Sequence, residues 1–131
     1  MIALDTNIII RFLVQDDPAQ CKIVDRLFER AVKSGDKLWI SNFVILEMIW
    51  VLERIFSVTR HDIINTIESL SCLPILAFED SVMLMTFCQM ALTTQQELDD
   101  LLIGLKGQIH CDYTFTFDKK AAKCNLFKLL K

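Results

Sequence analysis

The chain has 131 residues, of which 53 % are hydrophobic and 24 % charged, and its formal net charge at pH 7 is −3. This length is typical of one domain, so we expect residues 1–131 to form a single domain around one core. No stretch approaches the roughly 20 uninterrupted apolar residues of a membrane-spanning helix, so the apolar excess predicts a well-filled core and a buried partner surface.

The start of the chain and its cysteines indicate a cellular compartment. Asp5 follows Met1 too closely for the basic and apolar regions of a signal peptide, so we expect a cytoplasmic protein. The five cysteines are an odd number without the spacing of a disulfide framework or a zinc site. They are therefore predicted to be buried, reduced thiols.

Local patterning predicts the elements. In chain order we expect a strand at 2–4, helices at 6–14 and 18–34, a strand at 38–40, helices at 42–55 and 59–69, a strand at 73–78, helices at 80–91 and 97–107, and strands at 113–117 and 127–130. Asp5 or Thr6 is expected to cap the first helix and Ser41 the third. Pro74 is tolerated near the start of its strand.

The order of these elements predicts the fold class. Every pair of expected strands is separated by a helix or by enough residues for a crossover, as parallel strands require. The sequence therefore predicts an α/β fold, a three-layer α/β/α sandwich with a short, mostly parallel central sheet.

Four carboxylates occupy apolar contexts in which local patterning predicts burial: Asp5, Glu47, Asp100 and Asp118. A buried carboxylate is costly unless it is paired, protonated or bound to a cation, so together the four predict a divalent metal site. Asp5 and Asp118 follow strand-like runs, at the sheet edge where ligands bind. Taken alone, either residue is equally well explained as a helix cap or turn residue.

Glu47 is expected on an apolar helix face, because Phe43 and Trp50 lie one turn before and after it. The alternative to a metal ligand is a buried salt bridge with Arg11 or Arg54.

Two neighbouring acids, Asp99 and Asp100, are candidates for the third metal ligand. Asp99 and Asp100 point about 100° apart on a helix, so only one of them can face the site. Periodicity does not choose between them, and the other is interpreted as a first-turn acid favoured by the helix dipole. Glu53 is expected to face solvent.

Clustered carboxylates repel one another unless a cation discharges them, and Mg²⁺ or Mn²⁺ is the expected ion. Both ions prefer oxygen ligands and keep bound waters, which can serve as nucleophile while the ion stabilises charge on a phosphate. Neither His61 nor His110 has a zinc-like partner at helical spacing.

Four segments resemble the PIN domain family, specifically its VapC-type toxins: Ala3-Leu4-Asp5-Thr6-Asn7, the helix with Glu47, Asp100-Leu101-Leu102-Ile103, and Thr114-Phe115-Thr116-Phe117-Asp118-Lys119. The resemblance spans nearly the whole chain. It implies that Asp5, Glu47, Asp100 and Asp118 are the catalytic, metal-binding residues, with Glu47 bound directly or through water. It also selects Asp100 over Asp99.

The resemblance further implies a divalent-metal-dependent endoribonuclease that hydrolyses RNA phosphodiesters by metal-activated water. Asn7 and Thr116 would be polar supports and Glu97 an auxiliary acid. A small cognate antitoxin and a homodimer are the implied partners. The candidate RNA-binding residues are Arg11, Lys119, Lys120 and Lys123, although a solvated C-terminal face explains the lysines equally well.

Two other interpretations remain open. One is a non-catalytic PIN-like module that binds RNA or an antitoxin, which the complete set of acids disfavours. The other is a phosphatase that forms an aspartyl-phosphate, because Asp5-Thr6 follows a strand. Position 7 is Asn, whereas such phosphatases carry a second Asp there.

Overall fold

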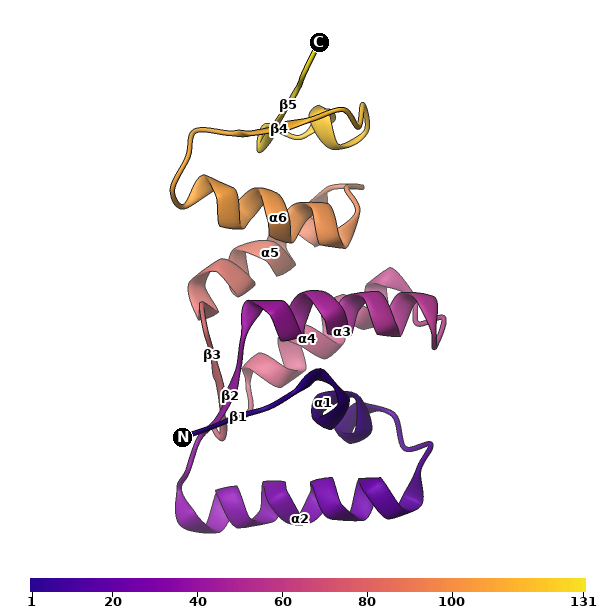
Figure 1. Cartoon of the computed structure of the whole chain (residues 1–131), viewed down its shortest axis with the longest axis vertical. Coiled ribbons are helices and arrows are strands. Elements are labelled where there is room, and N and C mark those ends of the chain that lie inside the picture. The colour runs from indigo at the N-terminus through magenta and orange to yellow at the C-terminus, as the bar shows by residue number, and fades with distance from the viewer.

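The computed structural model describes all residues, 1–131, and contains six α-helices, five strands and one 3-10 helix (Figure 1). In chain order these are β1 (Ile2–Ala3), α1 (Thr6–Leu13), α2 (Pro18–Ser34), β2 (Leu38–Ile40), α3 (Asn42–Arg54), α4 (Arg60–Ser71), β3 (Leu76–Phe78), α5 (Ser81–Thr93), α6 (Leu98–Gln108), β4 (Thr114–Thr116), η1 (Ala121–Lys123) and β5 (Phe127–Leu129).

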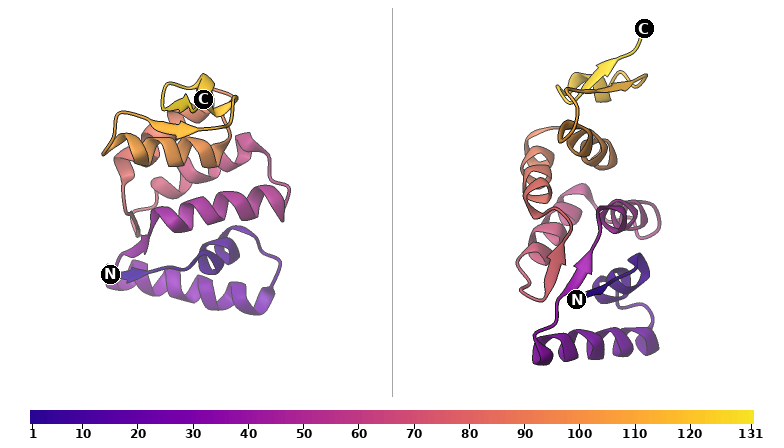
Figure 2. Two further views of the ribbon diagram at one scale, coloured as in Figure 1. Left: turned by 45° about the horizontal axis from the view of Figure 1, so that its top comes forward. Right: turned by 60° about the vertical axis from the view of Figure 1, so that its left-hand side comes forward.

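The central sheet has three parallel strands in the order β1-β2-β3. Ile2 lies beside Leu38, and Leu38 lies beside Leu76. In the right-hand view of Figure 2, α1 and α3 lie on one side of these strands, and α4 and α5 lie on the other. The predicted α/β fold on a short parallel sheet is therefore confirmed.

The last two strands form a separate sheet. β4 and β5 pair in parallel, with Thr114 beside Phe127, and neither pairs with the central sheet. Figure 1 shows α3 and α6 between β1 and this second sheet. The buried side chains of Leu98, Leu101 and Leu102 hold α6 in the core, and α6 carries β4 and β5 away from β1.

Short-range hydrogen bonds set the helix starts. Asp5 caps α1 by accepting from the Thr6 N–H, and the Ser41 hydroxyl caps α3 by accepting from the Val44 N–H. Both caps were expected. The predicted strand at 73–78 is shorter at its start, because a turn around Pro74 directs the Leu76 N–H to the Leu73 carbonyl.

One cluster of 31 buried side chains forms the core. All five cysteines are free, as predicted, but only Cys21, Cys88 and Cys124 are buried, so the expected burial is wrong for Cys72 and Cys111. Burial raises the pKa of the Cys88 thiol to about 11. None of the helices combines the length and hydropathy that crossing a bilayer requires.

Candidate functional site

Asp5 lies between β1 and α1, at the carboxyl end of the strand, as expected. Its Oδ1 accepts a hydrogen bond of 2.8 Å from the Thr6 N–H. Asp5 and the neighbouring Asn7 are both exposed, so the prediction of a buried carboxylate is wrong here. The helix-cap role and a ligand role remain compatible, because the cap uses only one carboxylate oxygen.

Glu47 is exposed on α3, and so are Phe43 and Trp50, one turn before and after it. Phe43 is 84 % exposed and Trp50 49 % exposed, because α3 turns a different face to the core. The expected burial of Glu47 is therefore wrong. The alternative salt bridge is also absent, since Glu47 forms no ion pair and Arg11 pairs with Asp16 instead.

The start of α6 gathers three acids. Glu97 is the N-cap residue, and Asp99 and Asp100 lie in the first turn, where the helix dipole favours negative charge. Asp99 Oδ1 accepts from the Asp100 N–H at 2.9 Å. Asp100 is half-buried whereas Asp99 is exposed.

Asp118 lies two residues beyond β4, and the backbone around it fixes its carboxylate. Its Oδ1 accepts from the N–H groups of Lys120 at 2.8 Å and Ala121 at 3.3 Å. Its own N–H donates to Thr116 Oγ1 at 3.0 Å. These bonds orient an exposed carboxylate whose second oxygen is free for another ligand.

The charges of the Asp100 and Asp118 carboxylates interact. Burial raises the pKa of Asp100, and the carboxylates of Asp99, Asp118 and Glu97 raise it further, while Lys120 acts in the opposite direction. A bound cation would offset this repulsion between like charges and favour the ionised form of Asp100.

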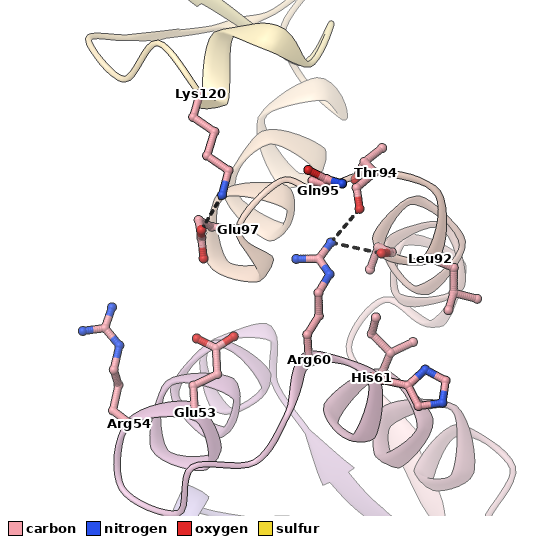
Figure 3. A pocket seen from close by; sticks show the side chains of 11 residues that line it. Glu53, Arg54, Arg60, His61, Leu92, Thr94, Gln95, Glu97 and Lys120 are labelled. Atoms are coloured by element: carbon pink, nitrogen blue, oxygen red, sulfur yellow. Dashed lines mark hydrogen bonds and ion pairs between the residues drawn. The ribbon is translucent and has the colours of Figure 1, made fainter.

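A cleft of about 630 Å³ lies between the end of α3 and the start of α6 (Figure 3). Glu53 lines it and is half-buried, so the expectation that Glu53 faces solvent is wrong. Burial raises the pKa of Glu53, followed by repulsion from Asp99 and Glu97. Across the cleft, Lys120 Nζ lies 2.8 Å from Glu97 Oε1.

Arg60 is a second residue of this cleft that sequence reasoning missed. Its guanidinium donates to the carbonyls of Ala91 at 3.0 Å and Thr94 at 3.2 Å, and also to the carbonyl of Gln96. Arg60 thus ties the end of α5 and the connection to α6 against the start of α4. No sequence spacing signals a bond between residues so far apart.

The candidate RNA-binding residues lie in two places. Lys119, Lys120 and Lys123 are exposed beyond β4, near Asp118. Arg11 lies on α1, where Asp16 and Gln20 hold its guanidinium. Figure 1 shows α1 and the segment after β4 in different parts of the molecule.

The four predicted ligands are divided between two parts of the chain. No group of three or more His, Cys, Asp or Glu side chains in the structure is arranged to hold a metal ion. Asp100 and Asp118 act on each other's charge, while Asp5 and Glu47 do not contribute to the raised pKa of Asp100. In this conformation the charges of Asp100, on α6, and Asp118, after β4, interact, and the chain forms no complete cation site.

Comparison with known proteins agrees with the sequence resemblance. The PIN domain family matches residues 2–125 of the chain. A VapC ribonuclease of Aquifex aeolicus (strain VF5) is 29 % identical over 70 residues, which cover 53 % of this chain and 51 % of that protein. The match thus spans about half the length of this curated relative. No solved structure matches the chain.

Proposed function

Because the chain belongs to the PIN domain family, we propose that it is a divalent-metal-dependent endoribonuclease and the toxin of a type II toxin–antitoxin pair. The observation that carries the proposal is the gathering of acids around Asp100, where burial, and then repulsion from the carboxylates of Asp99, Asp118 and Glu97, raises the pKa of Asp100. Repulsion among these carboxylates destabilises the folded protein, and a bound cation would remove that repulsion. Acids held together in this way are typical of a functional site.

In this proposal Asp100 and Asp118 hold Mg²⁺ or Mn²⁺, and Asp5 and Glu47 complete the ligand set, Glu47 directly or through water. The ion, when bound, supplies an activated water and positive charge for the hydrolysis of an RNA phosphodiester. The chain's own backbone prepares Asp118 for this role, because two N–H groups hold its Oδ1 in a fixed direction.

Other side chains would serve the substrate. The exposed ammonium groups of Lys119, Lys120 and Lys123 lie close in sequence to Asp118, so they are suited to contact RNA phosphates beside the site. Lys120 also neutralises Glu97, the proposed auxiliary acid. Arg11 is a further candidate, at a different part of the surface.

The partners proposed for this nuclease are a small cognate antitoxin and a second copy of the chain. The half-exposed Trp50 and the exposed Phe43 on α3 supply apolar surface for such contacts. The similar protein from Aquifex aeolicus is a VapC ribonuclease, and RNA is accordingly the proposed substrate.

The first test compares Asp100→Asn with its matched neighbour Asp99→Asn. Purified proteins are incubated with total RNA and Mg²⁺, and cleavage rates are measured with and without a chelator. We expect Asp100→Asn to lose cleavage by roughly a hundredfold or more, because a metal ligand is removed. Asp99→Asn should stay within a few-fold of the unmodified protein, which should itself lose activity in the chelator.

The same assay separates the other interpretations. Release of phosphate from a monoester without RNA cleavage would favour the aspartyl-phosphate chemistry at Asp5. Binding of RNA or antitoxin without any cleavage would favour the non-catalytic module. Asp5→Asn is expected to abolish both cleavage and growth inhibition while the circular-dichroism spectrum stays unchanged; an Asp5→Asn protein with full activity would contradict the metal site.

A further inference from the structure

The start of α6 lacks the side-chain cap that every other α-helix of this chain has. Each of the other helices follows a residue whose side-chain oxygen accepts a first-turn N–H: Asp5, Asp17, Ser41, Thr59 and Asp80. Glu97 occupies the same position before α6 and makes no such bond. Unsatisfied N–H groups leave a helix start poorly held. The position of the α6 start therefore depends on contacts from elsewhere in the fold.

Arg60 supplies these contacts (Figure 3). Its Nη2 donates to the carbonyls of Ala91 at 3.0 Å and Thr94 at 3.2 Å, and its Nη1 donates to the carbonyl of Gln96. Gln96 directly precedes Glu97, the N-cap residue of α6. One planar guanidinium thus binds the last turn of α5 and the connection to α6 together. Hydrogen bonds from a charged donor of this kind are stronger than those between neutral groups.

The backbone that carries Arg60 is itself firmly placed. Arg60 is the first residue of α4, whose start is capped by Thr59 Oγ1, 3.2 Å from the Asp62 nitrogen. In the next turn of α4, Ile63 and Ile64 are buried in the core. A positive group beside the last carbonyls of α5 also suits the dipole of that helix. Arg60 is therefore a fixed point from which the connection can be oriented.

The bonds of Arg60 add direction to the apolar contacts of α6. Leu98 and Leu101 are buried and hold α6 against the core, but apolar burial is not directional. Hydrogen bonds are directional, so those of Arg60 orient the backbone that leads into the first turn. Gln96 is buried and its Oε1 has no hydrogen-bond partner, so Arg60 provides a polar contact that its side-chain oxygen does not.

We propose that Arg60 is a positioning residue for the acids at the start of α6, an inference that rests on the proposed function. By holding the Gln96 carbonyl, Arg60 fixes the point at which the chain enters α6. The direction of that first turn decides where the Asp100 carboxylate lies. Arg60 contacts none of the acids through a hydrogen bond or ion pair, so its effect is transmitted by the backbone.

The effect extends to Asp118 through Glu97. Lys120 Nζ lies 2.8 Å from Glu97 Oε1, and the Lys120 N–H donates to Asp118 Oδ1 at 2.8 Å. The start of α6 and the segment after β4 are thus connected through one ion pair. This pair is exposed and therefore weak, so the effect of Arg60 should be larger at Asp100 than at Asp118.

Two variants separate the geometry of Arg60 from its charge. The charges that act on Asp100 are those of Asp99, Asp118, Glu97 and Lys120, and Arg60 is not among them. Arg60→Lys keeps a positive charge but replaces the planar fork with a single nitrogen, which cannot reproduce the bonds of both Nη atoms. Arg60→Met removes the fork and the charge. If position matters, the two variants should behave alike.

Hydrogen exchange measured by mass spectrometry tests the contact without reference to catalysis. Peptides covering residues 94–102 should exchange about tenfold faster in Arg60→Met and Arg60→Lys, because the lost bonds let this segment open locally. Peptides from α3 should change little. Arg54→Met is the matched control, since Arg54 is an exposed cation of the same cleft without a hydrogen bond or ion pair, and its peptides should exchange as in the unmodified protein.

Three results of this experiment would overturn the proposal. The first is equal exchange of residues 94–102 in Arg60→Met and Arg54→Met. The second is an unmodified rate in Arg60→Lys, since charge alone would then suffice. The third is equal acceleration in all peptides, which would give Arg60 a general role in stability. Arg60→Lys provides the comparison with Arg54→Met if Arg60→Met does not fold.

Mn²⁺ binding, followed by electron paramagnetic resonance, connects Arg60 to the acids. The Mn²⁺ affinity of Arg60→Lys should fall by about tenfold, and RNA cleavage should need correspondingly more Mg²⁺ for half its maximal rate. Arg54→Met should keep the unmodified values. Unchanged Mn²⁺ affinity in Arg60→Lys would overturn the positioning role. If the unmodified protein neither binds Mn²⁺ nor cleaves RNA, the proposed function fails, and hydrogen exchange still decides whether Arg60 positions the start of α6.

Discussion

At the scale of single residues, Glu53 shows how the acidic cleft affects the stability of the fold. It is half-buried, and burial, Asp99 and Glu97 together raise its pKa above the usual 4.5, while Arg54 and Arg60 partly offset the rise. A raised pKa means that the folded state binds the proton more tightly than the unfolded state does. The ionised form of Glu53 is therefore unfavourable for folding.

This sign predicts the effect of Glu53→Gln on thermal stability. Above the raised pKa, the variant should have a higher melting temperature than the unmodified protein, because it removes an unfavourable charge. The advantage should shrink as the pH falls through the raised pKa and disappear below about 4, where the glutamate is mostly protonated in both states. Melting curves by circular dichroism from neutral to acidic pH measure both effects.

The exposed Glu29 on α2 supplies the control, since Glu29→Gln should change the melting temperature little at any of these pH values. A Glu53→Gln protein that is no more stable than the unmodified protein at neutral pH would show that the ionised Glu53 carboxylate does not destabilise the folded state.

The positions of Arg60 and Glu53 in the cleft could not be predicted from the sequence around them. Their chemistry depends on the packing of α3, α4 and α6, which no local pattern reports. Asp5, by contrast, caps α1 through its immediate neighbour, and a short-range contact of that kind is readable from the sequence.

At the scale of elements, the contact of α6 with the second sheet depends on a glycine. A Cβ added at Gly104 would lie 2.7 Å from Cε2 of Phe127 and 3.0 Å from Cβ of Leu126. The absent side chain therefore lets β5 approach the helix closely, and this approach positions the segment that carries Asp118.

We predict that Gly104→Ala destabilises the protein despite the better helix propensity of alanine. Alanine would contribute about 1 kcal/mol to the helix, but the overlap with Phe127 costs roughly 1 to 3 kcal/mol. Urea unfolding followed by circular dichroism measures the balance. Adding Phe127→Leu should recover part of the loss, whereas a Gly104→Ala protein more stable than its parent would refute the close contact.

Elements were the most predictable level of this structure. Caps such as Ser41 and the glycine after α2 act within a few residues, so nearly all helix positions follow from the sequence. Strand lengths were less predictable, because the turn at Pro74 and the partner strands decide where pairing begins.

At the scale of the whole molecule, the main feature is the separation of β4 and β5 from the central sheet. β1 and β4 therefore each keep one edge without a partner strand, and Ile2 and Phe115 are 50 % and 56 % exposed along these edges.

The sequence by itself determined the α/β fold, the order of the elements and the resemblance to the PIN domain family, because these depend on local patterning and on short motifs. The tertiary structure decided which acids meet. It placed Asp100 near the charges of Asp118 and Glu97, left Asp5 and Glu47 exposed, and brought Glu53 into the cleft. The physical reason is that the packing of α6 on α3 and α5, a contact between distant segments, sets the path of the chain after residue 97.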